Sequence, residues 1–85
     1  MTHRQRAIMK ALLEALHNRD GGQLDEISIH ADACLIFREM IPKNEFDEAF
    51  ATLNRDGCFI GVKLKYNLMM WSLSARGVQA REEMR

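Results

Sequence analysis

Residues 42–60, PKNEFDEAFATLNRDGCFI, contain the change of periodicity that decides the fold. Apolar residues spaced i, i+3, i+4 and i+7 form one face of a helix, and this stretch has such a set: Phe46, Ala49, Phe50 and Leu53. Asn44 is a favoured residue at the N-cap of a helix. Gly57, in the NRDG segment, is typical of the position just after a helix end. We therefore expect a helix between Asn44 and Gly57.

The residues after this helix alternate with a period of two, which is typical of strands. In residues 58–74, CFIGVKLKYNLMMWSLS, two alternating runs flank the polar segment KYN and predict a β-hairpin. We expect one phase of the alternation to face the core: Ile60, Val62, Trp71 and Leu73. We expect the opposite phase to face outward: Phe59, Leu68 and Met70.

Helical patterns occupy both ends of the chain. Thr2 followed by Gln5 is a capping-box pattern, and a one-sided apolar stripe follows it. The segment NRDGG ends this first helix, with Gly21 and Gly22 as its C-cap and turn. Ser74 is a suitable cap for a short last helix over ARGVQAREEM, residues 75–84.

Residues 23–40, QLDEISIHADACLIFREM, have a mixed pattern. Ile27 and Ile29 alternate with polar neighbours, which predicts a very short strand. The residues after them follow the spacing of an amphipathic helix: Ala33, Ile36, Phe37 and Met40. Pro42 should end this second helix, because proline disfavours helical geometry in the residue before it.

Length and composition indicate one folded domain over residues 1–85. The chain has 85 residues, of which 47% are hydrophobic and 28% charged. The N-terminus lacks the apolar stretch of a signal peptide, and no apolar run is long enough to cross a bilayer, so we expect a cytoplasmic protein with no membrane partner.

Side chains that carry catalysis or bind metals form no known arrangement in this sequence. Cys34 and Cys58 are too far apart for a CxxC pair, and the three histidines complete no zinc-ligand spacing. No nucleophile–base arrangement and no phosphate-binding glycine loop is visible. We therefore expect reduced thiols, no metal or other cofactor, and no enzymatic activity.

The order helix, short strand, helix, helix, hairpin resembles the winged helix-turn-helix superfamily. Residues 50–62, FATLNRDGCFIGV, resemble the end of the third helix of that family where it leads into the first wing strand. Residues 69–80, MMWSLSARGVQA, resemble the second wing strand of MarR-like and related bacterial regulators. The resemblance covers nearly the whole chain. It implies an α+β winged helix-turn-helix fold, with a three-helix core, a C-terminal two-stranded β-hairpin wing and a short final helix.

In that family the outer face of the third helix enters the major groove of double-stranded DNA. At 100° per residue, the side of the third helix opposite its apolar face carries Asn44 and Arg55, where asparagine can read adenine and arginine can contact guanine or a phosphate. Four residues cluster at the tip of the predicted hairpin, where they suit phosphate or minor-groove contacts: Lys63, Lys65, Tyr66 and Asn67. If the start of the first helix lies on the same side, three of its residues would add backbone contacts: Arg4, Arg6 and Lys10. The implied function is a small DNA-binding transcriptional regulator or accessory factor of bacterial, phage or plasmid origin, acting as a homodimer on a symmetric site.

The charge distribution leaves an alternative open. The chain has no net charge, but both ends are basic and the middle is acidic. Glu45, Asp47 and Glu48 lie in the first turns of the third helix, where they oppose phosphate binding and also complement the helix dipole. The alternative is a winged-helix protein–protein interaction or dimerisation module without DNA binding. Its interface would be the outward phase of the hairpin, Phe59, Leu68 and Met70, covered by a second copy, the final helix or another protein.

Overall fold

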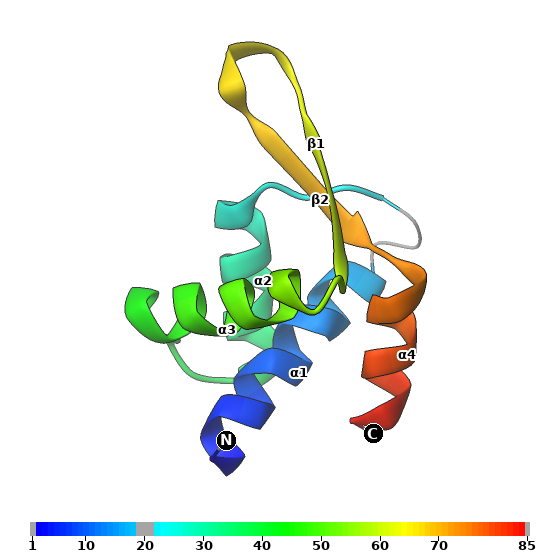
Figure 1. The fold of residues 1–85 in the computed structure, drawn as a ribbon. Helices are drawn as coiled ribbons and strands as arrows, with labels where there is room; N and C mark the ends of the chain where they lie inside the picture. The colour runs from blue at the N-terminus through cyan, green and yellow to red at the C-terminus, as the bar shows by residue number, and fades with distance from the viewer. Residues whose placement is uncertain (1, 19–21, 85) are drawn as a thin grey trace.

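The computed structural model describes residues 2–18 and 22–84 and has the predicted α+β winged-helix architecture. Its elements are α1 (His3–His17), α2 (Glu26–Phe37), α3 (Lys43–Arg55), β1 (Phe59–Lys63), the short 3-10 turn η1 (Lys65–Asn67), β2 (Met69–Leu73) and α4 (Ala75–Glu83). Helix α1 packs against α2, α3 and α4, and the hairpin projects from these helices as a wing (Figure 1). The start of α1 and the end of α4 lie on the side away from the wing tip (Figure 1).

Helix α1 begins with the predicted capping box. The Gln5 N–H donates to Thr2 Oγ1 over 3.1 Å, and the Thr2 N–H donates to Gln5 Oε1 over 2.8 Å. The helix ends at the predicted NRDGG segment, but Asn18 is the C-cap in place of a glycine, and its N–H donates to the Glu14 carbonyl over 2.9 Å. Gly21, expected as the cap, lies outside the described residues.

The short strand expected at Ile27 and Ile29 is wrong, since both residues lie in α2. Ile29 is fully buried and pairs at helical spacing with buried Ala33, whereas Ile27 is 81% exposed. The strand contact of this region is one residue long and lies earlier in the chain. Leu24 forms an isolated antiparallel bridge with Trp71, with N–H to O distances of 2.9 and 2.8 Å.

Helix α2 ends earlier than expected and buries fewer of its residues. It stops at Phe37, and Arg38 takes a left-handed conformation with φ 66°. Pro42 therefore does not terminate α2. Ile36 and Met40, expected in the core, are exposed.

Helix α3 buries the predicted face, Phe46, Ala49, Phe50 and Leu53. Its start differs from the prediction, because Pro42 occupies the N-cap position and Asn44 lies inside the first turn. The φ of Pro42, −56°, is close to that of a helix, and the Pro42 carbonyl accepts from the Phe46 N–H over 2.9 Å. Gly57 follows the helix at φ +78°, the left-handed conformation that glycine tolerates.

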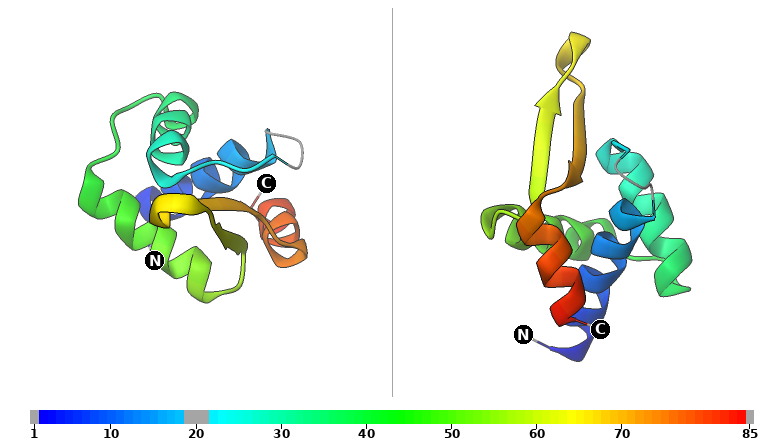
Figure 2. Two further views of the ribbon diagram at one scale, coloured as in Figure 1. Left: turned by 90° about the horizontal axis from the view of Figure 1, so that it is seen from above. Right: turned by 90° about the vertical axis from the view of Figure 1, so that its right-hand side faces the viewer.

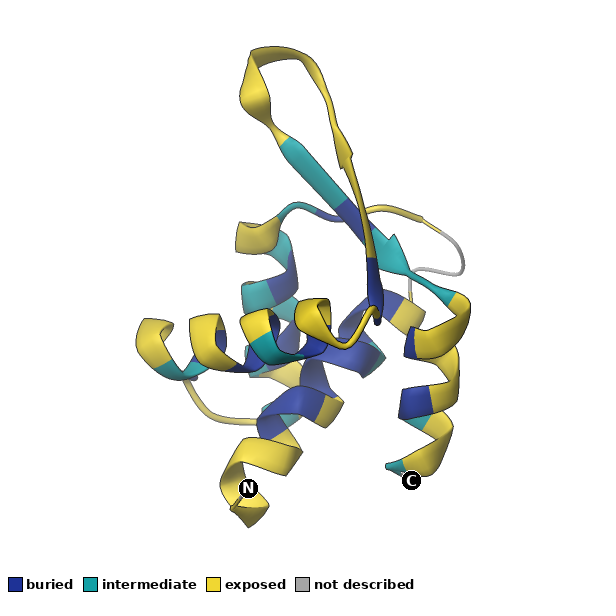
Figure 3. Ribbon diagram, in the orientation of Figure 1, coloured by how far each residue is buried: buried dark blue, intermediate teal, exposed yellow. Residues whose placement is uncertain are grey.

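The wing is a two-stranded antiparallel sheet in which Phe59 pairs with Leu73 and Gly61 pairs with Trp71. This register overturns the predicted phase of β1. Phe59 is 7% exposed and belongs to the core, whereas Ile60, expected in the core, is 49% exposed, and Val62 is also exposed (Figure 3). Gly61 permits this arrangement, because a Cβ there would lie 2.7 Å from Cζ3 of the Trp71 ring.

Aromatic rings join the wing to the helices. The Phe50 ring centroid lies 4.9 Å from that of Phe59 and 5.0 Å from that of Trp71, which it meets edge to face. Trp71 is therefore a core residue, as predicted. Ser74 caps α4 as predicted, since its Oγ accepts from the Gly77 N–H over 3.0 Å and donates to the Gly57 carbonyl over 2.6 Å.

Candidate nucleic-acid interface

The outer face of α3 carries the two expected base-contacting residues. Asn44 and Arg55 are exposed and lie opposite the buried face of the helix. They are separated by about three turns, roughly 16 Å at 1.5 Å per residue. The first and last turns of α3 are therefore both available on one side of the helix.

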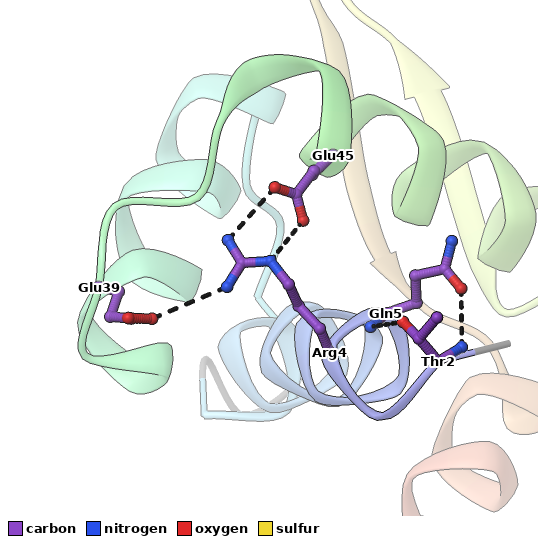
Figure 4. Close-up of polar contacts among 5 residues, drawn as sticks. All are labelled: Thr2, Arg4, Gln5, Glu39 and Glu45. Atoms are coloured by element: carbon purple, nitrogen blue, oxygen red, sulfur yellow. Dashed lines mark hydrogen bonds and ion pairs between the residues drawn. The ribbon is translucent and has the colours of Figure 1, made fainter.

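Two of the three acidic residues in α3 are neutralised within the chain. Arg4 of α1 makes a bidentate contact with Glu45, with Nε and Nη2 2.8 and 3.2 Å from the two carboxylate oxygens (Figure 4). Its Nη1 also lies 3.8 Å from Glu39. Lys43 pairs with Asp47 one turn later, with Nζ 2.6 Å from Oδ1. The ion pairs at the start of α3 thus leave less negative charge than the sequence suggests.

The contact between Arg4 and Glu45 also affects their protonation. The hydrogen bond from Arg4 lowers the pKa of Glu45, and the same bond raises the pKa of Arg4. Arg4 was expected to contact the DNA backbone, but its guanidinium is held by these carboxylates and lies over the ring of Phe37, 5.4 Å from the centroid. Its structural role is to join α1 to the start of α3 and to the end of α2.

Glu48 is the acidic residue of α3 that remains exposed without an ion pair among the described residues. It follows Asn44 by four residues and precedes Arg55 by two turns, so it lies on the outer face between them. A carboxylate here disfavours nearby phosphates but can accept a hydrogen bond from a cytosine amino group.

The wing tip gathers four expected contact residues at one end of the hairpin: Lys63, Lys65, Tyr66 and Asn67. All four are exposed, and Tyr66 is 98% exposed. Tyr66 and Asn67 both have φ 62°, and successive positive φ angles are the mark of tight hairpin turns of type I′. The Leu68 N–H closes the turn by donating to the Lys65 carbonyl over 3.4 Å, and the Leu64 N–H donates to the Leu68 carbonyl over 2.7 Å.

The two groups of candidate contacts are spatially separate. The wing tip lies at the far end of the hairpin from α3 (Figure 1), in a domain whose longest dimension is 37 Å. No ion pair among the described residues involves Arg55, Lys63 or Lys65. Arg6 and Lys10 are exposed on α1. The sequence analysis did not anticipate that Arg4 pairs with Glu45 and Lys43 with Asp47.

The expected protein interface is present only in part. Phe59 cannot belong to it, because its side chain packs in the core with Phe50. Leu68 is exposed and Met70 is half-buried. On the outward side of the sheet, Met70 pairs in register with exposed Val62, and Ile60 lies beside them.

The described residues contain no cluster of three or more histidine, cysteine, aspartate or glutamate side chains suited to a metal ion. Among the same residues, none of the helices has the length and apolar character needed to span a membrane.

The two cysteines differ in environment. Cys58 is buried, and burial raises the pKa of its thiol, whereas Cys34 is half-buried and its Sγ accepts from the Ile41 N–H over 3.3 Å.

The helices and the hairpin define a winged-helix fold, and solved structures confirm it. RosR of H. salinarum, from crystals grown with NaBr, aligns with a TM-score of 0.73 and 14% identity over 98% of this chain and 69% of its own. Two further structures, of the complexes hsRosR-S1 and hsRosR-S4, each align with a TM-score of 0.71 and 16% identity over 98% of this chain and 68% and 66% of theirs. No protein-family model and no curated protein matches the sequence significantly.

Proposed function

We propose that this chain is a winged-helix DNA-binding protein, a transcriptional regulator or an accessory factor that acts by binding and not by catalysis. In this proposal the outer face of α3 enters the major groove and the wing tip contacts the adjacent backbone. Within the winged-helix class, the MarR-like bacterial type is the one that residues 69–80 favour. The protein would act in the cytoplasm, where it would meet its DNA.

The distribution of ion pairs is the observation that supports this proposal most. Glu45 and Asp47 are paired with Arg4 and Lys43. Arg55, Lys63 and Lys65, by contrast, have no ion pair among the described residues, so their charge is available to phosphates. Non-specific affinity depends on the number of phosphates that lysine and arginine neutralise.

Each group would have a separate role at the DNA. Asn44 presents an amide that can make a bidentate contact with adenine, and Arg55 a guanidinium suited to guanine or a phosphate. Lys63 ends β1 and Lys65 begins the wing turn, in which Tyr66 is 98% exposed. This arrangement suits a phosphate or minor-groove contact that positions α3 without reading sequence itself.

The proposal is tested by fluorescence anisotropy of a labelled duplex, titrated with salt from about 50 to 200 mM. We expect Lys65→Glu to weaken binding to all sequences and to reduce the slope of log K against log[salt] by about 1. Arg76→Glu is the matched control: it makes the same charge change on α4, where Arg76 lies 3.7 Å from Glu83. Absence of binding at the lowest salt, or equal loss in both variants, would refute the wing contact.

Base reading by α3 is tested separately, on a duplex selected by the parent protein. Asn44→Ala should leave binding to random duplex unchanged and reduce discrimination at one position by about 1–3 kcal/mol. The exposed Ala51→Ser, on the same face, serves as the control for a change that removes no base contact. Unchanged site preference in Asn44→Ala would remove Asn44 from the reading surface.

The second candidate function is a protein-interaction module that uses the outward face of the wing. The observation that favours it is the exposure of Ile60, Val62 and Leu68 beside Met70. Under this alternative, Met70→Lys should abolish association measured by light scattering, because a charge would enter an apolar contact. Association that survives Met70→Lys would exclude Met70 from the contact.

A further inference from the structure

Helix α2 is apolar on both of its sides. Its inner side buries Ile29 and Ala33, which have no measurable exposure. Its outer side carries Ile27, 81% exposed, Leu35, 77% exposed, and Ala31 between them. A helix face that is apolar is normally buried against another element. Both views of Figure 2 show α2 at the margin of the molecule, with no other element outside it.

The three outer residues form one ridge. Ile27, Ala31 and Leu35 are spaced i, i+4 and i+8, and such rows of side chains interdigitate with the same rows of a second helix in the commonest packing of helices. The smallest side chain lies in the middle. When a second α2 lies antiparallel across a two-fold axis at Ala31, the two alanines meet, and each Ile27 lies opposite the Leu35 of the other copy. The ridge is therefore complementary to itself, as a two-fold interface requires.

The charges at the two ends of α2 fit the same arrangement. Asp25 and Glu26 lie at the N-terminus of the helix, and exposed Arg38 follows its C-terminus. An antiparallel second copy brings each Arg38 beside the acidic first turn of the other α2. Glu39, the neighbour of Arg38, lies 3.8 Å from Arg4 and is thus partly neutralised within its own chain. A parallel arrangement would bring like charges together instead.

From the exposed ridge and the end charges, we infer that two copies of this chain associate through α2, with Ile27, Ala31 and Leu35 at the centre of a two-fold contact. The contact does not use the outer face of α3, whereas its Ile27 end adjoins Asn67 and Leu68 of the wing, with which Ile27 lines one pocket. It does not depend on DNA binding. A single pair of helices buries less surface than a standard interface of roughly 1,200–2,000 Å². The association should therefore depend on protein concentration.

The first test measures the mass of the full chain by sedimentation over a wide range of concentrations, without DNA. We expect the parent protein to shift from monomer to dimer as its concentration rises, and Leu35→Glu to remain monomeric. Met40→Glu is the matched control, since Met40 is 81% exposed and apolar but lies outside the ridge. It should dimerise like the parent. Both positions are exposed, so thermal melts should show that both variants fold.

Three results would overturn the inference: a parent protein that is monomeric at every concentration, a Leu35→Glu variant that dimerises like the parent, or equal loss of the dimer in Met40→Glu. Loss of the dimer in Met70→Lys but not in Leu35→Glu would assign the interface to the wing and would equally overturn it.

The second test examines the orientation of the two helices. Arg38→Glu should weaken the dimer by placing like charges together, and adding Glu26→Arg in the same chain should restore it. Ala31→Cys should form a disulfide-linked dimer under mild oxidation, because the two cysteines would meet at the axis. Ala51→Cys, an exposed position on α3, should not. Failure of the charge reversal to restore the dimer, or equal cross-linking at residues 31 and 51, would refute the antiparallel contact.

Discussion

Replacing Trp71 by alanine should remove most of the stability of the domain. Trp71 is the wing residue through which the hairpin meets the core: its ring lies over Gly61 and contacts Phe50 edge to face, 5.0 Å between centroids. Truncation of a buried tryptophan costs about 3–5 kcal/mol. A domain of this length has a free energy of unfolding of roughly 4–13 kcal/mol. With a parent stability near the lower end of this range, the variant should be marginally folded or unfolded at 25 °C.

The assay is thermal unfolding followed by circular dichroism. For a domain of this size, each kcal/mol lowers Tm by about 4–8 °C, so the melt of Trp71→Ala should shift by more than 10 °C or lose its cooperative transition. Trp71→Phe is the informative companion: it keeps an aromatic ring against Phe50 and removes the indole Nε1, which is buried without a hydrogen-bond partner. The decrease in Tm should be clearly smaller for Trp71→Phe than for Trp71→Ala. A Trp71→Ala melt within a few degrees of the parent would refute the buried placement.

Two further predictions concern the helices. Gly77→Ala should destabilise the protein, although alanine usually favours a helix by about 1 kcal/mol, because the new Cβ would lie 2.2 Å from the Cys58 carbonyl oxygen; a raised Tm would contradict this packing. The pKa of Glu45 lies below its ordinary value of 4.5 in the folded state, so its pairing with Arg4 stabilises the fold above that pH and is lost as the pH falls through the lowered value. The Tm difference between the parent and Arg4→Gln should accordingly shrink on acidification, and a difference that persists at low pH would show that the pair does not contribute.

Local patterns in the sequence predicted those elements whose boundaries are set by neighbouring residues. The capping box of α1, the buried face of α3 and the Ser74 cap of α4 each depend on contacts within one or two turns. Helix α2 was misread because its own apolar residues are spread around the helix axis, so the sequence has no single polar side from which to infer the buried side. Ile27 and Ile29 alternate with polar neighbours, and this local pattern resembled a strand.

The phase of β1 could not be read from alternation alone. Apolar residues occupy both phases, and the choice between them depends on the register with β2. The structure places Gly61 under the Trp71 ring, which turns Phe59 inward and Ile60 outward. In a two-stranded sheet, a shift of one residue reverses every side chain of a strand. The glycine was the available signal, because its missing side chain marks a close approach.

The position of the candidate interface could be predicted from the sequence, but the pairing of Arg4 with Glu45 near it could not. Alternation and the polar KYN segment located the wing tip, and the helical period located Asn44 and Arg55 on one face. Pairing of Arg4 with Glu45 joins residues 41 positions apart, which no local pattern reveals. By contrast, Lys43 and Asp47 are four residues apart, a spacing from which their pairing could have been inferred.

The bridge between Leu24 and Trp71 has a consequence for the motion of the wing. It ties the middle of β2 to the segment before α2 through two backbone hydrogen bonds, while every residue from Leu64 to Leu68 is exposed. The hairpin is therefore anchored at Trp71, and its exposed part lies beyond this anchor. In amide hydrogen exchange, the N–H groups of Leu24 and Trp71 should be among the slowest of the wing region and those of the tip among the fastest. Local opening of the tip would therefore leave the aromatic contacts of Phe59 and Trp71 with Phe50 intact.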